Sequence, residues 1–338
     1  MRYLLNSSKD PYYNMAFDEF VLENMDLDCP VFYLWQNSPS VIIGMNQNAY
    51  AEVNIPYLEK QGILLVRRVT GGGAVYHDLQ NLNFTIAGKS RDLERDYPGY
   101  LHFMVDAIRS LGVNAELSGR NDIMVDGRKC SGYAKRVFKD RLMVHGTLMF
   151  NVNLEALTDA LAVPGSKLSA AGIASVRSRV ANLKDYLPGI RDIEEFQEKL
   201  FDIMSSNSHG GKDTEVSISD EQKSRIEALA DSKFRTWEWI YGRSPAGEFL
   251  QRRKFSCGTV EVSFSLNHGL ISLIRFGGDY LGNLHVDELE KRLTGIRFLK
   301  EEILSTLASG HHAGEYFDGM TDEELAGFIF SNQDTQNT

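Results

Sequence analysis

The sequence predicts an α+β protein with a larger N-terminal domain and a small C-terminal α+β domain. Its 338 residues are enough for roughly two domains of ~100–200 residues each. Apolar residues recur at helical spacing in some segments and cluster or alternate in short β-rich runs in others. The pattern changes at residues 241–247, where two glycines and a proline interrupt it. We therefore assign residues 1–243 to the first domain, 248–330 to the second and 331–338 to a polar tail.

In the N-terminal domain, a first helix is expected to begin at Asn14 as its N-cap and to carry apolar residues as far as Val21. A second helix has its apolar face over residues 101–111. Asp126 and Gly127 predict a tight hairpin, because glycine accepts the positive φ that such a turn requires. Strands are expected at residues 31–35, 41–43, 64–69, 74–76, 82–86, 123–125 and 142–152, a helical segment at 154–204, and a flexible loop at 205–212.

The C-terminal domain is expected to start with a hairpin. Residues 259–266 alternate between polar and apolar, which is typical of a half-buried strand, and an Asn-His-Gly turn leads into a second strand that ends near Phe276. A helix is expected over residues 286–296. Thr321 and Glu324 have the spacing of a capping box and predict a last helix.

Composition and charge argue against several classes of protein. The formal net charge of −10 disfavours a general nucleic-acid binder. No apolar stretch approaches the ~18 residues of a membrane span, and polar side chains follow the N-terminus too soon for a signal peptide. Three scattered cysteines, Cys29, Cys130 and Cys257, predict neither a disulfide framework nor a zinc site. We expect a cytoplasmic protein that binds neither nucleic acid nor membrane.

The segment RRVTGGGAVYHD, residues 67–78, is the most informative motif. Three consecutive glycines between two strands let the backbone approach a ligand and expose several N–H donors. The two arginines before them supply positive charge that suits a carboxylate or a phosphate. The segment is neither a Walker loop nor a Rossmann fingerprint. The alternative interpretation is a glycine-rich hairpin with its arginines on a solvated face.

A second cluster covers residues 119–136. Asn121 and Asp122 offer hard oxygen ligands of the kind that hold Mg²⁺ alongside substrate phosphates. Lys129 follows the tight turn on a strand, where a lysine can stabilise the negative charge that develops in acyl or phosphoryl transfer. Taken alone, Lys129 is better interpreted as a surface lysine in a basic hairpin.

Two further segments are less specific. His145 lies in a strand-like run with a glycine, where a histidine is more often structural than catalytic. Residues 172–183 combine small side chains with Arg177 and Arg179. This segment is either a phosphate-facing lid or the basic edge of a helix.

These four segments, in this order, resemble the lipoate–protein ligase A family. RRVTGGGAVYHD is similar to its lipoate- and adenylate-binding loop, and GRNDIMVDGRKCSGYAKR to its catalytic-lysine segment. HGTLMFN and GIASVRSRVANL are similar to the following strand and the adenylate-binding loop. Residues 236–239 resemble the end of the family's large domain, so the resemblance covers nearly the whole chain. It implies a lipoate/biotin ligase-like catalytic domain with a large mixed sheet, followed by an α+β accessory domain.

The resemblance also implies roles for individual residues. Lys129 matches the catalytic lysine, which contacts the carboxylate oxygen and the α-phosphate, and Arg68 matches an arginine that contacts the nucleotide phosphates. Asp122 is the implied Mg²⁺ ligand. The residues expected to bind nucleotide and acyl substrate are Arg68, Gly71, Gly72, Gly73, Ala74, Val75, Tyr76, His77, Asn121, Asp122, Lys129, Ser175 and Arg177.

Cys130 departs from the family, which often has a small or aliphatic residue after the lysine. Related acyltransferases on the same fold use a cysteine nucleophile, so octanoyl or lipoyl transfer through a thioester, without ATP, is an alternative function. Because Cys130 directly follows Lys129 on a strand, its side chain is expected to point to the opposite face. A non-enzymatic protein that binds lipoate or a carrier is a second alternative.

The resemblance implies an enzyme that uses ATP and Mg²⁺ to convert free lipoate into lipoyl-AMP and then transfers the lipoyl group to a lysine. The implied partners are lipoyl carrier proteins, namely the glycine cleavage H protein and the acyltransferase lipoyl domains of 2-oxoacid dehydrogenases. The sequence leaves open which carrier is preferred and whether octanoate is accepted.

Overall fold

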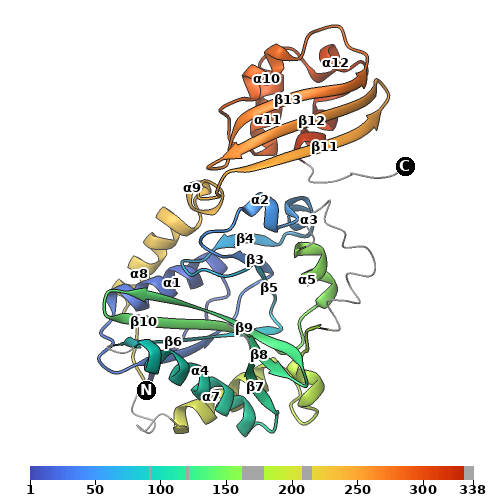
Figure 1. Cartoon of the computed structure of the whole chain (residues 1–338). Coiled ribbons are helices and arrows are strands. Elements are labelled where there is room, and N and C mark those ends of the chain that lie inside the picture. Colours follow the sequence, from blue (N-terminus) through green and yellow to red (C-terminus); the bar gives the residue numbers. More distant parts are fainter. Residues whose placement is uncertain (91–92, 119–121, 162–178, 208–214, 331–338) are drawn as a thin grey trace. The chain divides into compact units, whose positions relative to one another are not determined.

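The computed structural model describes residues 1–90, 93–118, 122–161, 179–207 and 215–330 (Figure 1). The chain forms two compact units. Among the described residues, the first comprises 1–45, 62–90, 93–118, 122–160, 179–207 and 215–236, and the second comprises 46–61, 161 and 237–330.

The first unit contains most of the strands. Its strands are β1 (Arg2–Tyr3), β2 (Val31–Trp35), β3 (Ser40–Ile43), β4 (Leu64–Arg67), β5 (Val75–His77), β6 (Asn81–Lys89), β7 (Ala115–Ser118), β8 (Asp122–Val125), β9 (Arg128–Phe138) and β10 (Arg141–Met149). Its helices are α1 (Pro11–Asn24), α4 (Leu93–Ser110), α5 (Leu154–Leu161), the 3₁₀ helix η1 (Leu183–Tyr186), α7 (Ile193–Asn207), α8 (Asp220–Leu229) and the π-helical turn η3 (Ala230–Phe234).

Seven strands form one sheet in the order β1-β2-β6-β10-β9-β8-β7. Only the β1–β2 pair is parallel, so the sheet is mixed, as the family resemblance implies. One face packs against α4 and α7 (Figure 1). Phe84 of the sheet, Met104 of α4 and Phe196 of α7 are fully buried in this core. Burial of such side chains is the main stabilising contribution to this layer.

The other face of the large sheet carries α1 and a second, three-stranded sheet in the order β4-β3-β5. β3 pairs parallel with β4 and antiparallel with β5. The glycine-rich loop connects β4 to β5, so it lies over the face of the large sheet that α4 and α7 leave uncovered (Figure 1).

The prediction that Asn14 caps the first helix is wrong, since α1 begins at Pro11. The N-cap is Asp10, whose carboxylate accepts a hydrogen bond from the backbone N–H of Tyr12, and a proline at the first helical position lacks the N–H that would need a partner. Asn14 lies inside the helix and is buried. Its amide donates to the side-chain oxygen of Asn37 at 2.8 Å.

The predicted hairpin between β8 and β9 is confirmed, with φ values of 49° at Asp126 and 71° at Gly127. The helical segment expected at residues 154–204 is divided between α5, η1 and α7. α7 continues to Asn207, so the loop expected from residue 205 does not begin there, and residues 208–214 lie outside the described part of the chain.

The second unit is built on an antiparallel sheet in the order β11-β12-β13. Its strands are β11 (Gly247–Phe255), β12 (Gly258–Asn267) and β13 (Leu270–Tyr280). Its helices are α2 (Ala49–Glu52), α3 (Ile55–Gln61), α9 (Trp237–Ile240), α10 (Asp287–Leu293), α11 (Lys300–Ala308), α12 (Ala313–Tyr316) and α13 (Asp322–Phe330). The predicted hairpin corresponds to β12 and β13, whereas β11 was not expected. The capping box before α13 is confirmed, because Thr321 and Glu324 exchange hydrogen bonds at 2.9 and 3.1 Å.

Residues 46–61 belong to the second unit, although they lie between β3 and β4 in the sequence. The hydroxyl of Tyr50 donates to the carbonyl of Phe298 at 3.1 Å, and its ring stacks on Tyr241 at 5.4 Å between centroids. The backbone N–H of Ala49 donates to the hydroxyl of Ser244. The boundary at residues 243–248 stays a prediction, and no local sequence pattern indicates that residues 46–61 belong to the C-terminal unit.

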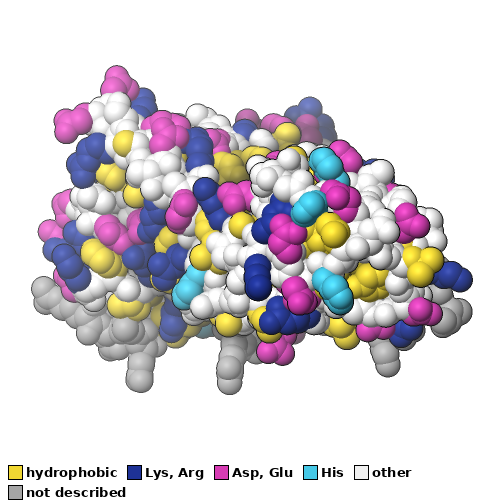
Figure 2. All heavy atoms as spheres, turned by 90° about the horizontal axis from the view of Figure 1, so that it is seen from above, with side chains coloured by type: hydrophobic (Ala, Val, Ile, Leu, Met, Phe, Trp, Pro, Cys, Tyr) yellow, Lys and Arg dark blue, Asp and Glu magenta, His cyan; other side chains and the backbone are white. Residues whose placement is uncertain are grey.

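Charged side chains of both signs are interspersed over the face drawn in Figure 2. Among the residues that the structure describes, no helix has the length and apolar character needed to cross a bilayer.

Candidate functional site

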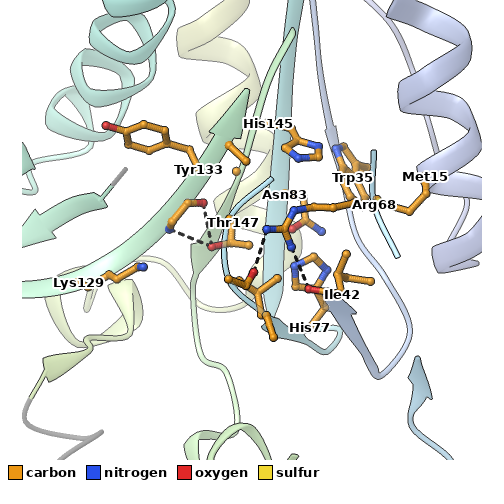
Figure 3. A pocket seen from close by; sticks show the side chains of 17 residues that line it. Met15, Trp35, Ile42, Arg68, His77, Asn83, Lys129, Tyr133, His145 and Thr147 are labelled. Atoms are coloured by element: carbon orange, nitrogen blue, oxygen red, sulfur yellow. Dashed lines mark hydrogen bonds between the residues drawn. The ribbon is translucent and has the colours of Figure 1, made fainter. Parts of the chain in front are cut away.

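A pocket lies in the first unit, between the large sheet and the β4-β3-β5 sheet (Figure 3). α1 contributes Met15, the β3 side contributes Ile42, and the large sheet contributes residues of β2, β6, β9 and β10. The full lining is Met15, Trp35, Ile42, Arg68, Gly72, Gly73, Ala74, Val75, His77, Asn83, Lys129, Gly132, Tyr133, Ala134, His145, Gly146 and Thr147. The pocket is elongated, with Lys129 at one end and Trp35 and Met15 at the other (Figure 3).

Arg68 anchors the glycine-rich loop through hydrogen bonds to backbone carbonyls. Its guanidinium donates to the backbone carbonyls of Ile42 at 2.9 Å, Gly71 at 2.7 Å and Gly73 at 2.8 Å (Figure 3). Burial lowers the pKa of Arg68 to about 10, so the group remains charged at neutral pH. Its positive charge therefore lies directly under the loop. The direct phosphate contact that the resemblance implies for Arg68 stays a prediction.

Two glycines allow the loop to fold against β3. Gly72 has a φ of +96°, which side chains rarely adopt, and a Cβ there would come within 2.9 Å of the Arg68 guanidinium. A Cβ on Gly44 would lie 2.1 Å from the carbonyl oxygen of Gly72, which no relaxation of a side chain could relieve. Sequence reasoning identified Gly72 but missed Gly44, whose only signal is a glycine directly after a short buried strand.

Lys129 and Asp122 form an ion pair with 2.7 Å between Nζ and Oδ1. Both side chains are little more than one-third exposed. A register shift between Ile123 and Met124 re-aims this part of β8 against β9. The carbonyl of Lys129 accepts from the N–H of Ala181, which fixes the strand at this residue. The pair therefore places a cation and a carboxylate at one end of the pocket.

Cys130 faces away from the pocket, as the strand alternation predicts. It is fully buried in the core that packs against α4 and α7, and its thiol donates to the carbonyl of Ile123 at 3.4 Å. Burial raises the pKa of Cys130 to about 12. The thiolate, which is the nucleophilic form, is therefore scarcely populated at neutral pH.

A buried chain of hydrogen bonds connects α1 to the glycine-rich loop. His145 Nδ1 lies 2.6 Å from a carboxylate oxygen of Asp18, and its Nε2 lies 2.8 Å from the hydroxyl of Thr70. That hydroxyl also accepts from Arg68 Nε at 2.9 Å. The Asp18 carboxylate accepts, so His145 Nδ1 donates to it, and in the neutral ring Nε2 then accepts from the hydroxyl of Thr70. These bonds give His145, which lines the pocket, a structural role, and no sequence pattern identifies its partner Asp18.

The expected site residues are only partly brought together. Those that line the pocket are Arg68, Gly72, Gly73, Ala74, Val75, His77 and Lys129. Asp122 does not line the pocket itself but forms an ion pair with the lining residue Lys129. Gly71 and Tyr76 are not among the lining residues. Asn121, Ser175 and Arg177 lie outside the described residues. The sequence analysis missed Met15, Trp35 and Ile42 in the lining, because these residues have the pattern of ordinary core positions.

The residues present are compatible with a magnesium ion held largely by phosphate and water. Within the described ranges, no group of three or more His, Cys, Asp or Glu side chains is arranged to hold a metal ion. Mg²⁺ is commonly bound through one or two carboxylates together with substrate phosphates. Asp122, partly exposed beside Lys129, is the one expected ligand that the structure places at the pocket.

A mixed sheet, a glycine-rich loop and a lysine at the end of a largely apolar pocket define an acyl-ligase type of catalytic domain. Residues 10–205 match the family model of the lipoyl protein ligase A/B catalytic domain, and residues 244–329 match that of the bacterial lipoate protein ligase C-terminus. The chain belongs to the lipoate–protein ligase family.

Two relatives extend over almost the whole chain. Lipoate–protein ligase LplJ of Bacillus subtilis is 35% identical over 322 residues, which cover 95% of this chain and 97% of the relative. Lipoate–protein ligase 1 of Staphylococcus aureus is 38% identical over 327 residues, which cover 96% and 98%.

Solved structures of lipoate–protein ligases resemble the chain over about 70% of its length. A Thermoplasma acidophilum protein with bound lipoic acid is 31% identical, with a TM-score of 0.60 over 71% of this chain and 98% of that protein. A lipoate–protein ligase A bound with ATP is 32% identical, with a TM-score of 0.62 over 72% and 98%. A bi-partite ligase from T. acidophilum, studied with its E2 lipoyl domain, is 32% identical, with a TM-score of 0.65 over 72% and 96%.

Proposed function

We propose that this chain is an ATP-dependent lipoate–protein ligase, which forms lipoyl-AMP from free lipoate and ATP and then transfers the lipoyl group to a lysine of a carrier domain. The observation that carries this proposal is the elongated pocket, with a lysine at one end and Met15 and Trp35 at the other (Figure 3). An acyl chain with a charged head fits this distribution, because its carboxylate faces Lys129 and its tail is removed from water. Relatives with bound lipoic acid and with bound ATP support the same assignment.

In the first step, a carboxylate oxygen of lipoate attacks the α-phosphorus of ATP. The bond from that phosphorus to the bridging oxygen breaks, and pyrophosphate leaves. Lys129 is positioned to attract both the carboxylate and the α-phosphate, and the backbone N–H groups of residues 71–73 offer further donors. When bound, Mg²⁺ supplies positive charge that offsets the triphosphate, and Asp122 is the residue that would hold it.

In the second step, the ε-amine of the carrier lysine attacks the acyl carbonyl of lipoyl-AMP. A new amide bond forms, the bond from the acyl carbon to the AMP oxygen breaks, and the amine gives up a proton. Lys129 is placed to polarise the carbonyl and to stabilise the oxygen that becomes negative. The step needs no covalent enzyme intermediate, and the buried thiol of Cys130 does not offer one.

The proposed acceptors are lipoyl carriers, namely the glycine cleavage H protein and the acyltransferase lipoyl domains of 2-oxoacid dehydrogenases, with the cytoplasm as the place of reaction. The relative studied with its E2 lipoyl domain supports acceptors of the second kind.

The proposal is tested by the two half-reactions. The purified chain is incubated with lipoate, ATP and Mg²⁺, and pyrophosphate release and lipoyl-AMP are followed by a coupled assay and mass spectrometry. A lipoyl domain is then added, and its gain in mass is measured. Carrier lipoylation from an acyl-carrier thioester without ATP would favour the transferase instead. Ligand binding without pyrophosphate release would favour a non-enzymatic protein.

A further inference from the structure

His77 lines the pocket and carries a buried ring nitrogen that has no hydrogen-bond partner in the described part of the chain. Its side chain is 3% exposed, and Nδ1 lies 3.0 Å from the amide nitrogen of Asn37. The orientation of that amide is fixed, because the Asn37 oxygen accepts from Asn14 at 2.8 Å. Asn37 therefore donates to Nδ1, and the ring proton must lie on Nε2. Nε2 is buried and has no partner among the described residues.

The imidazole of His77 is neutral at physiological pH. The pKa of His77 is lowered to about 3, chiefly by burial and in addition by electrostatic interaction with Arg68 and His145. A neutral ring with a fixed tautomer is a donor that does not change with pH in this range. Because a buried donor without a partner costs about 1–3 kcal/mol, such a group marks a place where a ligand acceptor is missing.

Asn83 supplies a second unpaired donor to the same lining. In the amide orientation of this structure, its side-chain oxygen accepts from Asn81 at 2.9 Å, and the amide nitrogen is the remaining donor. That nitrogen is buried and has no partner within the described part of the chain. His77 and Asn83 thus come from β5 and β6 and line one pocket. Two unpaired donors in one cavity are more than ordinary core packing requires.

Both donors lie on the side of the pocket away from Lys129. Figure 3 shows His77 and Asn83 near Arg68, with Trp35 and Ile42, while Lys129 stands at the opposite end. The rings of Trp35 and His77 are 6.3 Å apart and nearly perpendicular. If the carboxylate of the acyl substrate faces Lys129, the distal part of its tail reaches this donor-bearing end.

We propose that His77 and Asn83 form a donor pair that selects an acyl tail carrying a hydrogen-bond acceptor, the disulfide sulfurs of lipoate, over the all-carbon tail of octanoate. The inference rests on the proposed function, because it assumes that the carboxylate lies at Lys129. Sulfur is a weak acceptor, so it satisfies the donors only in part. An alkyl tail leaves both donors buried and unpaired, and a site with unpaired polar groups discriminates against such a substrate.

The test compares two substitutions at His77. His77→Asn keeps an oxygen acceptor near the Nδ1 position for Asn37 but removes the distal donor. His77→Gln places an amide near the Nε2 position and is the matched control. For each variant, kcat/KM of pyrophosphate release is measured with lipoate and with octanoate, and the affinity for each acid alone is measured by calorimetry. Asn83→Ser, which shortens the second donor, is tested in the same way, and thermal unfolding checks that each variant is folded.

We expect His77→Asn to lower the lipoate-to-octanoate ratio of kcat/KM by about threefold to tenfold, mainly through a higher KM for lipoate. His77→Gln should restore at least half of that ratio, and Asn83→Ser should shift it in the same direction as His77→Asn. An unchanged ratio in folded His77→Asn and Asn83→Ser, or equal losses with both acids, would overturn the inference. If the unaltered chain releases no pyrophosphate with either acid, the proposed function itself fails.

Discussion

Lys129 is the residue on which the proposed chemistry depends most. Lys129→Ala removes the cation that we propose contacts the carboxylate and the α-phosphate, and it removes the ion-pair partner of Asp122. We expect pyrophosphate release to fall by at least about 100-fold, which is the range seen for loss of a charge-stabilising group. The Lys129 side chain is partly exposed, so the fold should remain intact by circular dichroism. A folded variant with near-normal pyrophosphate release would exclude Lys129 from the reaction.

A substitution at Cys130 distinguishes the ligase mechanism from transfer through a thioester. Cys130→Ser should keep most of the ligase activity, since the thiol packs in the core and does not line the pocket. The buried hydroxyl of serine is expected to lower the free energy of unfolding by about 1–3 kcal/mol, measured by urea unfolding. A folded but inactive variant, together with an acyl-thioester trapped on the unaltered chain, would contradict the ligase mechanism.

His77 should make the protein more sensitive to acid. Its pKa is about 3 in the folded chain, chiefly because of burial, against about 6.5 in an unfolded chain. Between these values the unfolded chain binds a proton that the folded chain does not. The free energy of unfolding therefore falls as the pH decreases from about 6.5, by up to about 1.4 kcal/mol per pH unit. Urea unfolding at pH 7 and pH 5 should show a smaller loss for His77→Asn than for the unaltered chain. Equal losses would mean that His77 does not stay neutral.

At the scale of single residues, the sequence predicted the charged and glycine positions of the site better than its apolar ones. Lys129 and Gly72 belong to motifs whose spacing has a chemical meaning. Asp18, by contrast, is one acidic residue on a helix, and its contact with His145 joins residues 127 positions apart. No local pattern contains that information.

The glycine-rich loop is the element whose shape the site requires. Gly72→Val should weaken lipoate and nucleotide binding together, because a branched side chain disfavours a φ of +96° and would meet Arg68. Gly44→Ala should have a similar effect, since its Cβ would collide with the Gly72 carbonyl. We expect the affinity for each ligand to fall by about tenfold or more in calorimetry, because a cost of ~1–3 kcal/mol is typical of backbone strain.

Gly71→Ala is the matched control for these substitutions. A Cβ at Gly71 meets no atom within 4 Å, and its φ is not in the left-handed region. Binding by Gly71→Ala should stay within about twofold of the unaltered chain. If Gly72→Val and Gly44→Ala also bound both ligands normally, the loop would be a simple turn without a part in binding.

At the scale of elements, apolar periodicity and turn residues predicted most strands of the first unit, the β12–β13 hairpin and the helices α1, α4, α10 and α13. The unpredicted elements include β1, β7, β11, α2, α3, α8, α9, α11 and α12. β11 was missed because Arg252, Arg253 and Lys254 obscure its alternation, although the strand pairs with β12 along its whole length. α1 begins four residues earlier than expected, because Asp10 and Asn14 are both good N-caps and the proline between them decides in favour of Asp10.

At the scale of the whole molecule, the chain passes from one unit to the other on both sides of residues 46–61 and again at residues 236–237. The inserted segment directly follows Met45, a residue that contacts the glycine-rich loop. The N–H of Met45 donates to the carbonyl of Thr70 at 2.8 Å, and Arg67 donates to the carbonyls of Gly44 and Met45 at 3.1 Å. Residues that hold the loop are thus joined covalently to a segment that packs within the C-terminal unit, a long-range arrangement that no local sequence pattern contains.

We expect this connection to couple the C-terminal unit to adenylation. Adenylation needs a dry, closed pocket, whereas transfer must admit a carrier lysine, so the two units should move relative to each other between the steps. Small-angle scattering should therefore change when a non-hydrolysable lipoyl-adenylate analogue binds. Tyr50→Ala, which removes the stacking on Tyr241 and the bond to Phe298, should lower adenylation by about tenfold while transfer from supplied lipoyl-AMP is retained.

Tyr50→Phe keeps the ring and loses only the hydroxyl. Its adenylation rate should therefore lie between that of the unaltered chain and that of Tyr50→Ala. Comparing the two Tyr50 variants is more informative than truncating the chain after residue 241. Truncation would remove the packing partners of residues 46–61, so a loss of activity through unfolding could not be distinguished from a loss of coupling. A single-site change inside the C-terminal unit that slows the first half-reaction and spares the second is the signature of coupling. Identical scattering with and without the analogue, together with equal effects of Tyr50→Ala on both half-reactions, would show that the C-terminal unit has no such part in catalysis.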